Sequence, residues 1–284
     1  MPELPEVETV VRDLKAAGLV GLRVTEARVL WNRSIAMPSP ARFVREIKGL
    51  QIRDLSRRGK FVVLTLSGGY SLLIHLRMSG HLHAARAGRS PHDRVVLMIS
   101  DGRVFRFEDT RKFGRIWLTR DPARVLGTLG PEPFAVGAHE FAAGLAARSR
   151  FLKPLLLDQT FIAGIGNIYS DEALWSARLH PKRQSDSLSE AEAASLLHAI
   201  KKALRQGIRH LGTTFGAGRA HFVLPGGGRG NNQEHLNAYG RTGEPCPRCG
   251  TPIRRILVGQ RSTHICPQCQ RRRTTNRRKH KRSG

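Results

Sequence analysis

The first residues of the chain could supply an amine nucleophile. Pro2 follows Met1, and removal of Met1 would leave a secondary amine beside the carboxylate of Glu3. An α-amino group titrates near about 8, so a useful fraction is unprotonated and nucleophilic at neutral pH. Because the proline nitrogen is secondary, its condensation with a sugar aldehyde gives a charged iminium directly. Taken alone, Pro2 and Pro5 are more typical of a stiff start to a helix.

All four cysteines lie late in the chain, in two pairs. They follow the pattern C-x2-C-x16-C-x2-C and are Cys246, Cys249, Cys266 and Cys269. This spacing fits four thiolates around one zinc ion, and two disulfides are the alternative. We favour zinc because a cytosolic chain keeps its thiols reduced. A closed four-thiolate shell has no open position, so we expect this Zn²⁺ to hold a fold and not to activate water.

The charge of the chain indicates a polyanionic partner. Its 284 residues carry a formal net charge of +26. Lysines and arginines that neutralise phosphates gain affinity by releasing counterions, so nucleic acid is the leading partner. An anionic membrane is the alternative, but no run approaches the roughly 18 to 20 apolar residues of a spanning helix. The N-terminus also lacks the features of a signal peptide, and we expect a cytoplasmic protein.

The element that must position the amine is a helix. Residues 5 to 17 place their apolar side chains on one helical face, and Gly18 follows as a stop. These side chains are Val7, Val10, Val11 and Leu14. If the helix begins at Pro5, its positive end lies beside the proline amine and disfavours protonation, which favours nucleophilic attack.

Strands are predicted from about residue 22 to residue 118. Residues 61–66 and 70–76 flank a Ser-Gly-Gly turn, and residues 94–100 and 103–109 flank an Asp-Gly turn. Both arrangements are typical of hairpins. Several such hairpins in succession predict a sandwich or a barrel.

The second half of the chain is predicted to be helical. The Gly-Pro-Glu-Pro run at 130–133 predicts a linker. Ser187 and Glu190 predict a capping box, and Gly212 lies just past the end of the helix that follows. The side chains predicted to face inward on this helix are Leu196, Leu197, Ile200, Leu204 and Ile208. Residues 216–232 predict a mobile loop, because they are rich in glycine and polar residues.

A glycine pair lies before another predicted helix, in the segment 163–172. Glycines at a helix start let backbone N–H groups approach a phosphate. A plain tight turn would use the same glycines, so this pattern alone favours neither function.

Taken together and in order, these motifs resemble the formamidopyrimidine-DNA glycosylases. They are PELPEVETV from residue 2, RRGK at 57–60, HLRMSG at 75–80, DTRKFGR at 109–115, GIGNIYSDEALW at 164–175, and the cysteine pairs. The matches run from residue 2 to residue 269, and their order and combination are specific to that family.

The resemblance implies an α+β multidomain fold. It comprises an N-terminal β-sandwich catalytic domain with a leading helix at 1–130 and a helical, helix-two-turn-helix domain with a lesion-recognition loop at 131–230. A zinc-finger hairpin at 231–271 and a basic tail at 272–284 follow, and we expect the tail to be disordered.

The resemblance also implies a bifunctional DNA-formamidopyrimidine glycosylase and DNA-(apurinic or apyrimidinic site) lyase of base-excision repair. Such enzymes attack the deoxyribose C1′ carbon through an N-terminal proline, release the damaged base and retain an imine to the opened sugar. Successive β- and δ-eliminations then leave a gap in one strand. The implied partner is double-stranded DNA containing damaged bases, bound by a monomer in a bacterial-type cytoplasm at the nucleoid.

The catalytic residues implied by the resemblance are five. Pro2 matches the nucleophile and Glu3 the general acid, and Glu6 matches a second carboxylate near the amine. Lys60 matches a lysine that contacts phosphate and assists β-elimination. Arg261 matches an arginine linked to phosphate binding and δ-elimination.

Further residues match the family's DNA contacts. Three of them fill the void left by the extruded base, and these are Met78, Arg111 and Phe113. Without the match, Met78 and Phe113 would more often pack in a strand core. The other matched contacts are His92, Lys153 and Asn167, and Arg150 lies where the family often carries more basic residues.

The lesion preference depends on the loop at 216–235, where this sequence departs from the family. We expect oxidised purines such as 8-oxoguanine and formamidopyrimidines. The first alternative is an endonuclease VIII-type glycosylase for oxidised pyrimidines, a group that usually lacks the three void-filling residues together. A non-catalytic zinc-ribbon DNA-binding protein is the second alternative, and Pro2, Glu3 and Lys60 argue against it.

Overall fold

The computed structural model describes residues 1–86, 88–215, 222, 224–225 and 227–272. The predicted disorder of the basic tail falls on residues 273–284, outside the described residues, as does much of the predicted mobile loop. Contacts between residues divide the chain into two units. The sandwich unit comprises Met1–Val136, Asp158–Gly166 and Lys201–Leu236, and the zinc unit comprises Gly137–Leu157, Asn167–Ile200 and Asn237–Gly284.

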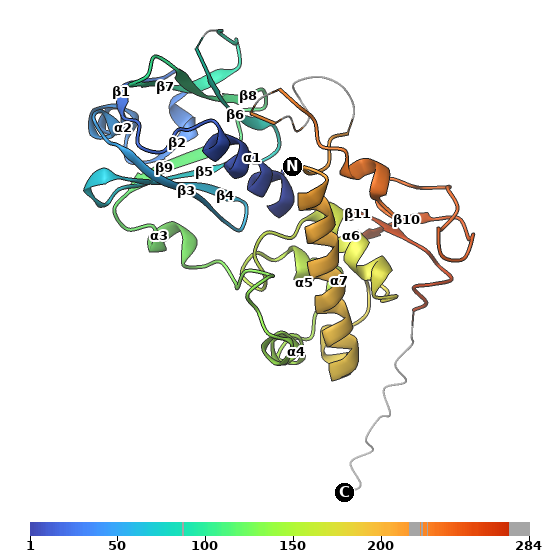
Figure 1. Ribbon diagram of the computed structural model, residues 1–284. Coiled ribbons are helices and arrows are strands. Elements are labelled where there is room, and N and C mark those ends of the chain that lie inside the picture. Colours follow the sequence, from blue (N-terminus) through green and yellow to red (C-terminus); the bar gives the residue numbers. More distant parts are fainter. Residues whose placement is uncertain (87, 216–221, 223, 226, 273–284) are drawn as a thin grey trace, which may run out of the picture. The chain divides into compact units, whose positions relative to one another are not determined.

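Two sheets form the sandwich unit (Figure 1). The first has the order β1-β7-β8-β6 and consists of β1 (Val24–Val29), β7 (Asp93–Ile99), β8 (Val104–Asp109) and β6 (Gly80–Ala85). The second has the order β2-β9-β5-β4-β3 and consists of β2 (Ile35–Met37), β9 (Arg115–Thr119), β5 (Ser71–His75), β4 (Phe61–Leu66) and β3 (Ile52–Arg58). Only β2 and β9 pair in parallel among these strands. Both predicted hairpins are confirmed, as β4–β5 and β7–β8.

One hydrophobic core joins these sheets to the first helix. Helix α1 (Leu4–Ala16) contributes Val7 and Leu14, which pack in one cluster with Leu72 of β5 and Phe107 of β8. Alternate residues of the strands point into this core, as expected for two sheets that cover each other. The predicted helix and sandwich are therefore confirmed, although the helix begins at Leu4. Two short helices complete the strand region, α2 (Pro40–Ile47) and α3 (Ala123–Leu126).

The zinc unit is helical and ends in a hairpin. Its helices are α4 (Ala138–Ala146), α5 (Leu152–Leu157), α6 (Asn167–Ser176) and the first turns of α7 (Glu190–Arg209), and its hairpin pairs β10 (Arg254–Val258) with β11 (Arg261–Ile265). Within the described ranges, no helix is long and apolar enough to cross a membrane.

The start of α7 differs from the predicted capping box. Ser189 Oγ accepts the N–H of Glu192 at 3.2 Å, and Glu192 Oε2 accepts the N–H of Ser189 at 3.0 Å. The S-x-x-E pattern occurs twice in succession here, and Ser187 closes a short 3-10 turn instead. The capping box at Ser187 and Glu190 is therefore wrong by two residues, while the helix itself is confirmed.

The segment 130–133 is held firmly and does not behave as a loose linker. Gly130 donates its N–H to the carbonyl of Gln159 at 2.8 Å, and Ala163 donates to the carbonyl of Pro131 at 3.0 Å. A Cβ at Gly130 would lie 2.6 Å from a backbone atom of Phe161. The Gly-Pro-Glu-Pro run thus packs against residues 159–163, because Gly130 has no side chain and allows their backbone to approach closely.

Candidate active site

Helix α1 begins directly after the predicted nucleophile, where two carboxylates are fixed. Pro2 is buried, and the side chains of Glu3 and Glu6 are 2% and 1% exposed. Glu3 caps the helix: its side chain accepts the N–H of Glu6, and Glu6 Oε2 accepts the N–H of Glu3 at 2.8 Å. This reciprocal capping holds both carboxylates beside Pro2 and places the positive helix end there.

The glycine pair of the GIG turn lets another segment of the sandwich unit approach Glu3. Glu3 Oε2 accepts the N–H of Gly166 at 2.7 Å, and Leu4 donates its N–H to the carbonyl of Gly164 at 2.9 Å. A Cβ at Gly166 would lie 2.3 Å from Glu3 Cδ. Gly166 therefore allows the close approach of the Glu3 carboxylate, and Gly164 that of Leu4.

Glu6 is tied to the segment that follows α7. Its Oε1 accepts the N–H of Thr213 at 2.8 Å. Gly212 has a φ of +84°, and a Cβ there would lie 2.9 Å from Glu6 Cγ. Both carboxylates thus accept backbone N–H groups from distant segments, which fixes their orientation around Pro2.

Lys60 lies in the turn between β3 and β4, and Glu132 fixes that turn. Glu132 accepts the N–H of Gly59 at 2.6 Å and binds Arg57 at 2.7 Å and Arg58 at 3.0 Å. Burial alone would raise the pKa of Glu132, but these arginines and the Gly59 N–H lower it. Two arginines of the RRGK motif are therefore engaged by Glu132, while Lys60 is 5% exposed. The sequence interpretation missed Glu132, and its only signal was an acidic residue between two prolines.

His75 lies in the same part of the sandwich unit. Its pKa is lowered to about 3 by burial first, and then by the positive charges of Arg77 and Lys60. Its Nδ1 accepts the N–H of Arg77 at 3.0 Å, which places the proton of the neutral ring on Nε2. The ring is therefore neutral over the working range of pH.

The three predicted void-filling residues lie on two exposed turns. Met78 and Phe113 are 41% and 52% exposed, so neither packs in the core. Arg111 is also exposed, and its guanidinium lies 5.6 Å from the centre of the Phe113 ring. His92 is half-buried, and its carbonyl accepts the N–H of Asp109 at 2.9 Å. The alternative of strand core packing is thus excluded for Met78 and Phe113.

The zinc unit gathers the four cysteines. Their Sγ atoms all lie within 4.8 Å of one another, and none of the four forms a disulfide. A tetrahedral zinc ion with Zn–S bonds of about 2.3 Å holds its sulfurs about 3.8 Å apart, so the four residues fit the ion. They are Cys246, Cys249, Cys266 and Cys269, and they flank the β10–β11 hairpin on both sides. The centre is a site for one structural zinc, and the hairpin that it holds presents Arg261, which is exposed.

Asn167 and Lys153 are joined to this hairpin. Asn167 Nδ2 donates to the carbonyl of Ser262 at 3.0 Å. Lys153 is fully buried, and its ammonium pairs with Asp171 and lies 3.4 Å from the same Ser262 carbonyl. Its ammonium is therefore engaged within the zinc unit, and the predicted DNA contact of Lys153 stays a prediction. Arg150 is exposed, and its N–H donates to Ser185 Oγ at 3.3 Å.

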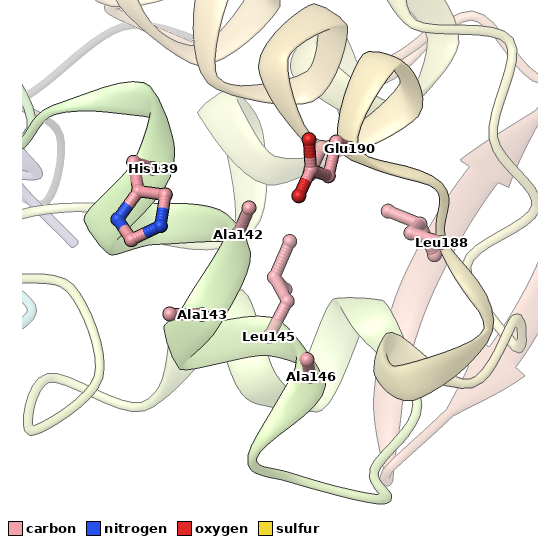
Figure 2. A pocket seen from close by; sticks show the side chains of 8 residues that line it. His139, Ala142, Ala143, Leu145, Ala146, Leu188 and Glu190 are labelled. Carbon is pink, nitrogen blue, oxygen red and sulfur yellow. The ribbon is translucent and has the colours of Figure 1, made fainter.

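A cavity of about 170 Å³ in the zinc unit lies apart from all these residues. Leu145 and three alanines of α4 line it together with Leu188, Glu190 and His139, and Figure 2 shows Leu145 between the helix and Glu190. None of the predicted site residues lines it. The cavity is therefore not the active site.

The fold and these sites define a zinc-containing DNA repair glycosylase. Three successive parts of the sequence match known families. Residues 1–116 match the formamidopyrimidine-DNA glycosylase N-terminal domain, residues 129–217 its H2TH domain, and residues 243–272 the zinc finger found in FPG and IleRS. The chain belongs to the formamidopyrimidine-DNA glycosylase family.

Similar proteins cover most of the chain. The formamidopyrimidine-DNA glycosylase of Herpetosiphon aurantiacus is 47% identical over 278 residues, which cover 95% of this chain and 100% of that protein. That of Protochlamydia amoebophila is 43% identical over 275 residues, with the same coverage of 95% and 100%. A solved complex between a mutant of the Lactococcus lactis FPG and a Fapy-dG containing DNA has a TM-score of 0.87 at 35% identity, and covers 95% of this chain and 100% of that one.

Proposed function

We propose that this enzyme excises oxidised purines from duplex DNA and cleaves the strand through an imine to Pro2. The observation that carries the proposal is the start of α1, where Pro2 is buried beside Glu3 and Glu6, each of which accepts a backbone N–H. Fixed carboxylates beside an amine provide the groups that nucleophilic attack and proton transfer require. The complex of a relative with a Fapy-dG containing DNA supports purine lesions as the substrate class.

The reaction begins with attack of the Pro2 nitrogen on the deoxyribose C1′ carbon. The C1′–N bond to the damaged base breaks, the base leaves with a proton, and the sugar ring opens to an iminium on Pro2. The iminium acidifies the C2′–H, and loss of that proton expels the 3′ phosphate. A second elimination expels the 5′ phosphate, and water then releases the sugar fragment. Glu3 supplies and removes protons at the sugar, and Glu6 holds the amine in place.

Removal of Met1 is a condition of this chemistry. While Met1 remains, the nitrogen of Pro2 is part of an amide, and its lone pair is delocalised into the carbonyl and cannot attack. Met1 is 48% exposed, so a processing enzyme can reach it. The mature enzyme of this proposal therefore begins at Pro2.

The remaining residues bind the DNA backbone or fill the void. Lys60 contacts the phosphate next to the lesion and assists β-elimination, and Arg261 assists δ-elimination. For Lys153 we propose a contribution to DNA binding through Asn167 and the hairpin, because its ammonium is buried. The other phosphate contacts are His92, Arg150 and Asn167, and the void-filling residues are Met78, Arg111 and Phe113.

Borohydride trapping tests the proposal. The protein without Met1 is incubated with 8-oxoguanine duplex and sodium borohydride, which should reduce the iminium and yield a covalent adduct that maps to Pro2. A variant with an uncleaved N-terminal extension is the matched control and should give none. Absence of an adduct from the processed protein would favour the non-catalytic zinc-ribbon alternative.

Substrate choice is tested with the same protein. Excision rates on duplexes with 8-oxoguanine and with thymine glycol are compared, and we expect 8-oxoguanine to react faster. Faster cleavage of thymine glycol would favour the endonuclease VIII-type alternative.

We further propose that the protein acts as a monomer in the cytoplasm, where its duplex DNA substrate lies. For its domains we propose boundaries at 1–130, 131–230 and 231–271, followed by the basic tail.

A further inference from the structure

The two turns that carry the void-filling residues are joined by one carboxylate. Asp109 is fully buried at the end of β8. Its Oδ1 accepts the hydroxyl of Ser79 at 2.5 Å and the N–H of Arg111 at 3.1 Å, and its Oδ2 accepts the N–H of Gly114 at 2.7 Å. Ser79 directly follows Met78, while Arg111 and Gly114 bracket Phe113. A single side chain thus binds both turns.

Close packing beneath the carboxylate restricts the turns further. Phe107 is fully buried, and a Cβ at Gly80 would lie 2.9 Å from its ring. A Cβ at Gly114 would lie 2.2 Å from the same ring. Each turn therefore needs a glycine to rest on Phe107.

The backbone of both turns is held in a conformation that costs energy. Arg77 has a φ of +55° and Lys112 a φ of +59°, the left-handed region that side chains other than glycine rarely adopt. Arg77 precedes Met78, and Lys112 precedes Phe113. Strain of this kind persists only where the surroundings determine it. His75 Nδ1 accepts the N–H of Arg77, and Asp109 holds Arg111 and Gly114 on the two sides of Lys112.

The charge of Asp109 is balanced by neutral donors. In the part of the chain that the structure describes, no ion pair involves this carboxylate, and its partners are a hydroxyl and two backbone N–H groups. An asparagine at this position would present an NH2 group to one of these donors. In place of Oδ2, the NH2 group leaves the N–H of Gly114 without its acceptor; in place of Oδ1, it leaves Arg111 with Ser79 Oγ alone.

We propose that Asp109 is a positioning residue for base extrusion, which holds the Met78 turn and the Arg111–Phe113 turn together as one preformed wedge. The inference rests on the proposed function, since it concerns the step before Pro2 attacks. Extrusion of a base loses stacking and pairing, and a wedge that is already ordered fills the void without a further loss of entropy.

The experiment compares two substrates of the full-length processed protein. Single-turnover excision is measured on an 8-oxoguanine duplex, which requires extrusion, and strand cleavage on a preformed abasic duplex, which contains no base to extrude. For Asp109→Asn we expect excision to slow by about 10-fold or more, the rate equivalent of one unsatisfied buried donor. Cleavage at the abasic site should change by less than about 3-fold on the same scale.

A fluorescence measurement reports the wedge directly. 2-Aminopurine beside the lesion brightens when the stack opens, and Asp109→Asn should slow this phase by the same factor as excision. Ser79→Ala removes the hydroxyl that donates to Asp109 and accepts the N–H of Arg111 at 3.1 Å, and it should slow both by a smaller factor. If Asp109→Asn does not fold, the Ser79→Ala variant still tests the inference through the same two measurements.

The matched control is Thr119→Val, in the same unit. Thr119 is 8% exposed, and its Oγ1 accepts the N–H of Asp121 at 3.0 Å, far along β9 from the turns. It should lower the melting temperature without changing the ratio of the two rates. The inference would be overturned if the Asp109 and Ser79 variants slowed both reactions equally, or if they left the fluorescence phase unchanged. Failure of the wild-type protein to form a borohydride adduct would instead overturn the proposed function.

Discussion

Two buried aspartates hold predicted DNA-binding segments in place, and they do so in different ways. In the sandwich unit, the Asp109 carboxylate accepts only neutral donors among the described residues. In the zinc unit, Asp171 pairs with the buried ammonium of Lys153 and accepts the N–H and Nδ1 of His264 at 2.9 and 3.1 Å. A charge balanced by dipoles leaves only neutral groups unsatisfied when it is lost, whereas a charge balanced by an ion leaves that ion buried alone. The sandwich unit should therefore tolerate loss of its aspartate better than the zinc unit.

Zinc removal should have the largest effect on stability, and it should affect the zinc unit but not the sandwich unit. Binding of structural zinc contributes about 10–16 kcal/mol of apparent free energy in zinc-finger peptides, because the unfolded chain has no preformed site. Chelation should unfold the β10–β11 hairpin and displace Arg261. Product analysis on abasic DNA should then show β-elimination products without δ-elimination products. An Arg261→Ala variant with zinc bound is the control and should give the same products, and a chelated protein that still performs δ-elimination would contradict the role of the hairpin.

Loss of Asp171 should have the next largest effect. Asp171→Ala leaves the Lys153 ammonium buried without its partner, and we expect the free energy of unfolding to fall by about 3–5 kcal/mol. Urea unfolding measures this change. Asp109→Asn should lower the same free energy by about 1–3 kcal/mol, since it leaves one buried neutral donor unsatisfied.

A second variant sharpens the difference between the aspartates. Replacing both partners, as in Lys153→Met with Asp171→Leu, removes the uncompensated charge and should recover the part of the lost stability that the buried ammonium causes. The donors of His264 stay without an acceptor in both variants, so their cost remains. If the double variant were as unstable as Asp171→Ala, the ion pair would not be the source of the loss.

Acid should act on the sandwich unit through His75. The pKa of His75 is about 3 in the folded protein, lowered by burial and by the charges of Arg77 and Lys60, against about 6.5 in an unfolded chain. Between these values the unfolded chain binds a proton that the folded protein does not, so stability is present above pH 6.5 and falls as the pH falls toward 3. Between pH 7 and pH 5 this single group should lower the free energy of unfolding by about 2 kcal/mol.

Urea unfolding at both pH values measures the effect. His75→Asn keeps an acceptor for the N–H of Arg77 but does not titrate, and should remove that part of the pH dependence. His139→Asn, at an exposed histidine, is the control and should retain it. Equal pH dependence in all three proteins would show that folding does not lower the pKa of His75.

Local patterns in the sequence predicted more of the fold than of the network that supports the site. The hairpins and the zinc cysteines follow from spacing within a few residues, and the structure has them where the spacing predicts. The interior position of Lys153 depends on Asp171 and on the carbonyl of Ser262, whose separation from Lys153 in the sequence is 18 and 109 residues. Nothing local distinguishes this lysine from a surface one.

The roles of Glu132 and Asp109 could not be predicted either, because their contacts also join residues far apart in the sequence. Glu132 lies in a run that reads as a linker, and its partner Gly59 lies 73 residues away. Asp109 belongs to a recognised motif, but its contact with Ser79 spans 30 residues. The sequence therefore predicts which side chains touch DNA, while the groups that hold them follow only from the folded chain.

The smallest expected effect concerns a cation–π contact that also holds the Phe113 turn. The Lys112 ammonium lies 4.2 Å from the centre of the Trp31 ring, and such a contact contributes about 0.5–1 kcal/mol at an exposed site. Trp31→Leu should therefore slow 8-oxoguanine excision by about 2- to 5-fold, less than Asp109→Asn, with little change on abasic DNA. Tyr70→Leu is the matched control, because it removes a similar contact with Arg120 at 4.6 Å away from the turns. If Trp31→Leu slowed excision as much as Asp109→Asn, the exposed Lys112–Trp31 contact would support the turn as much as the buried carboxylate does. Burial of Asp109 would then not explain its effect on extrusion.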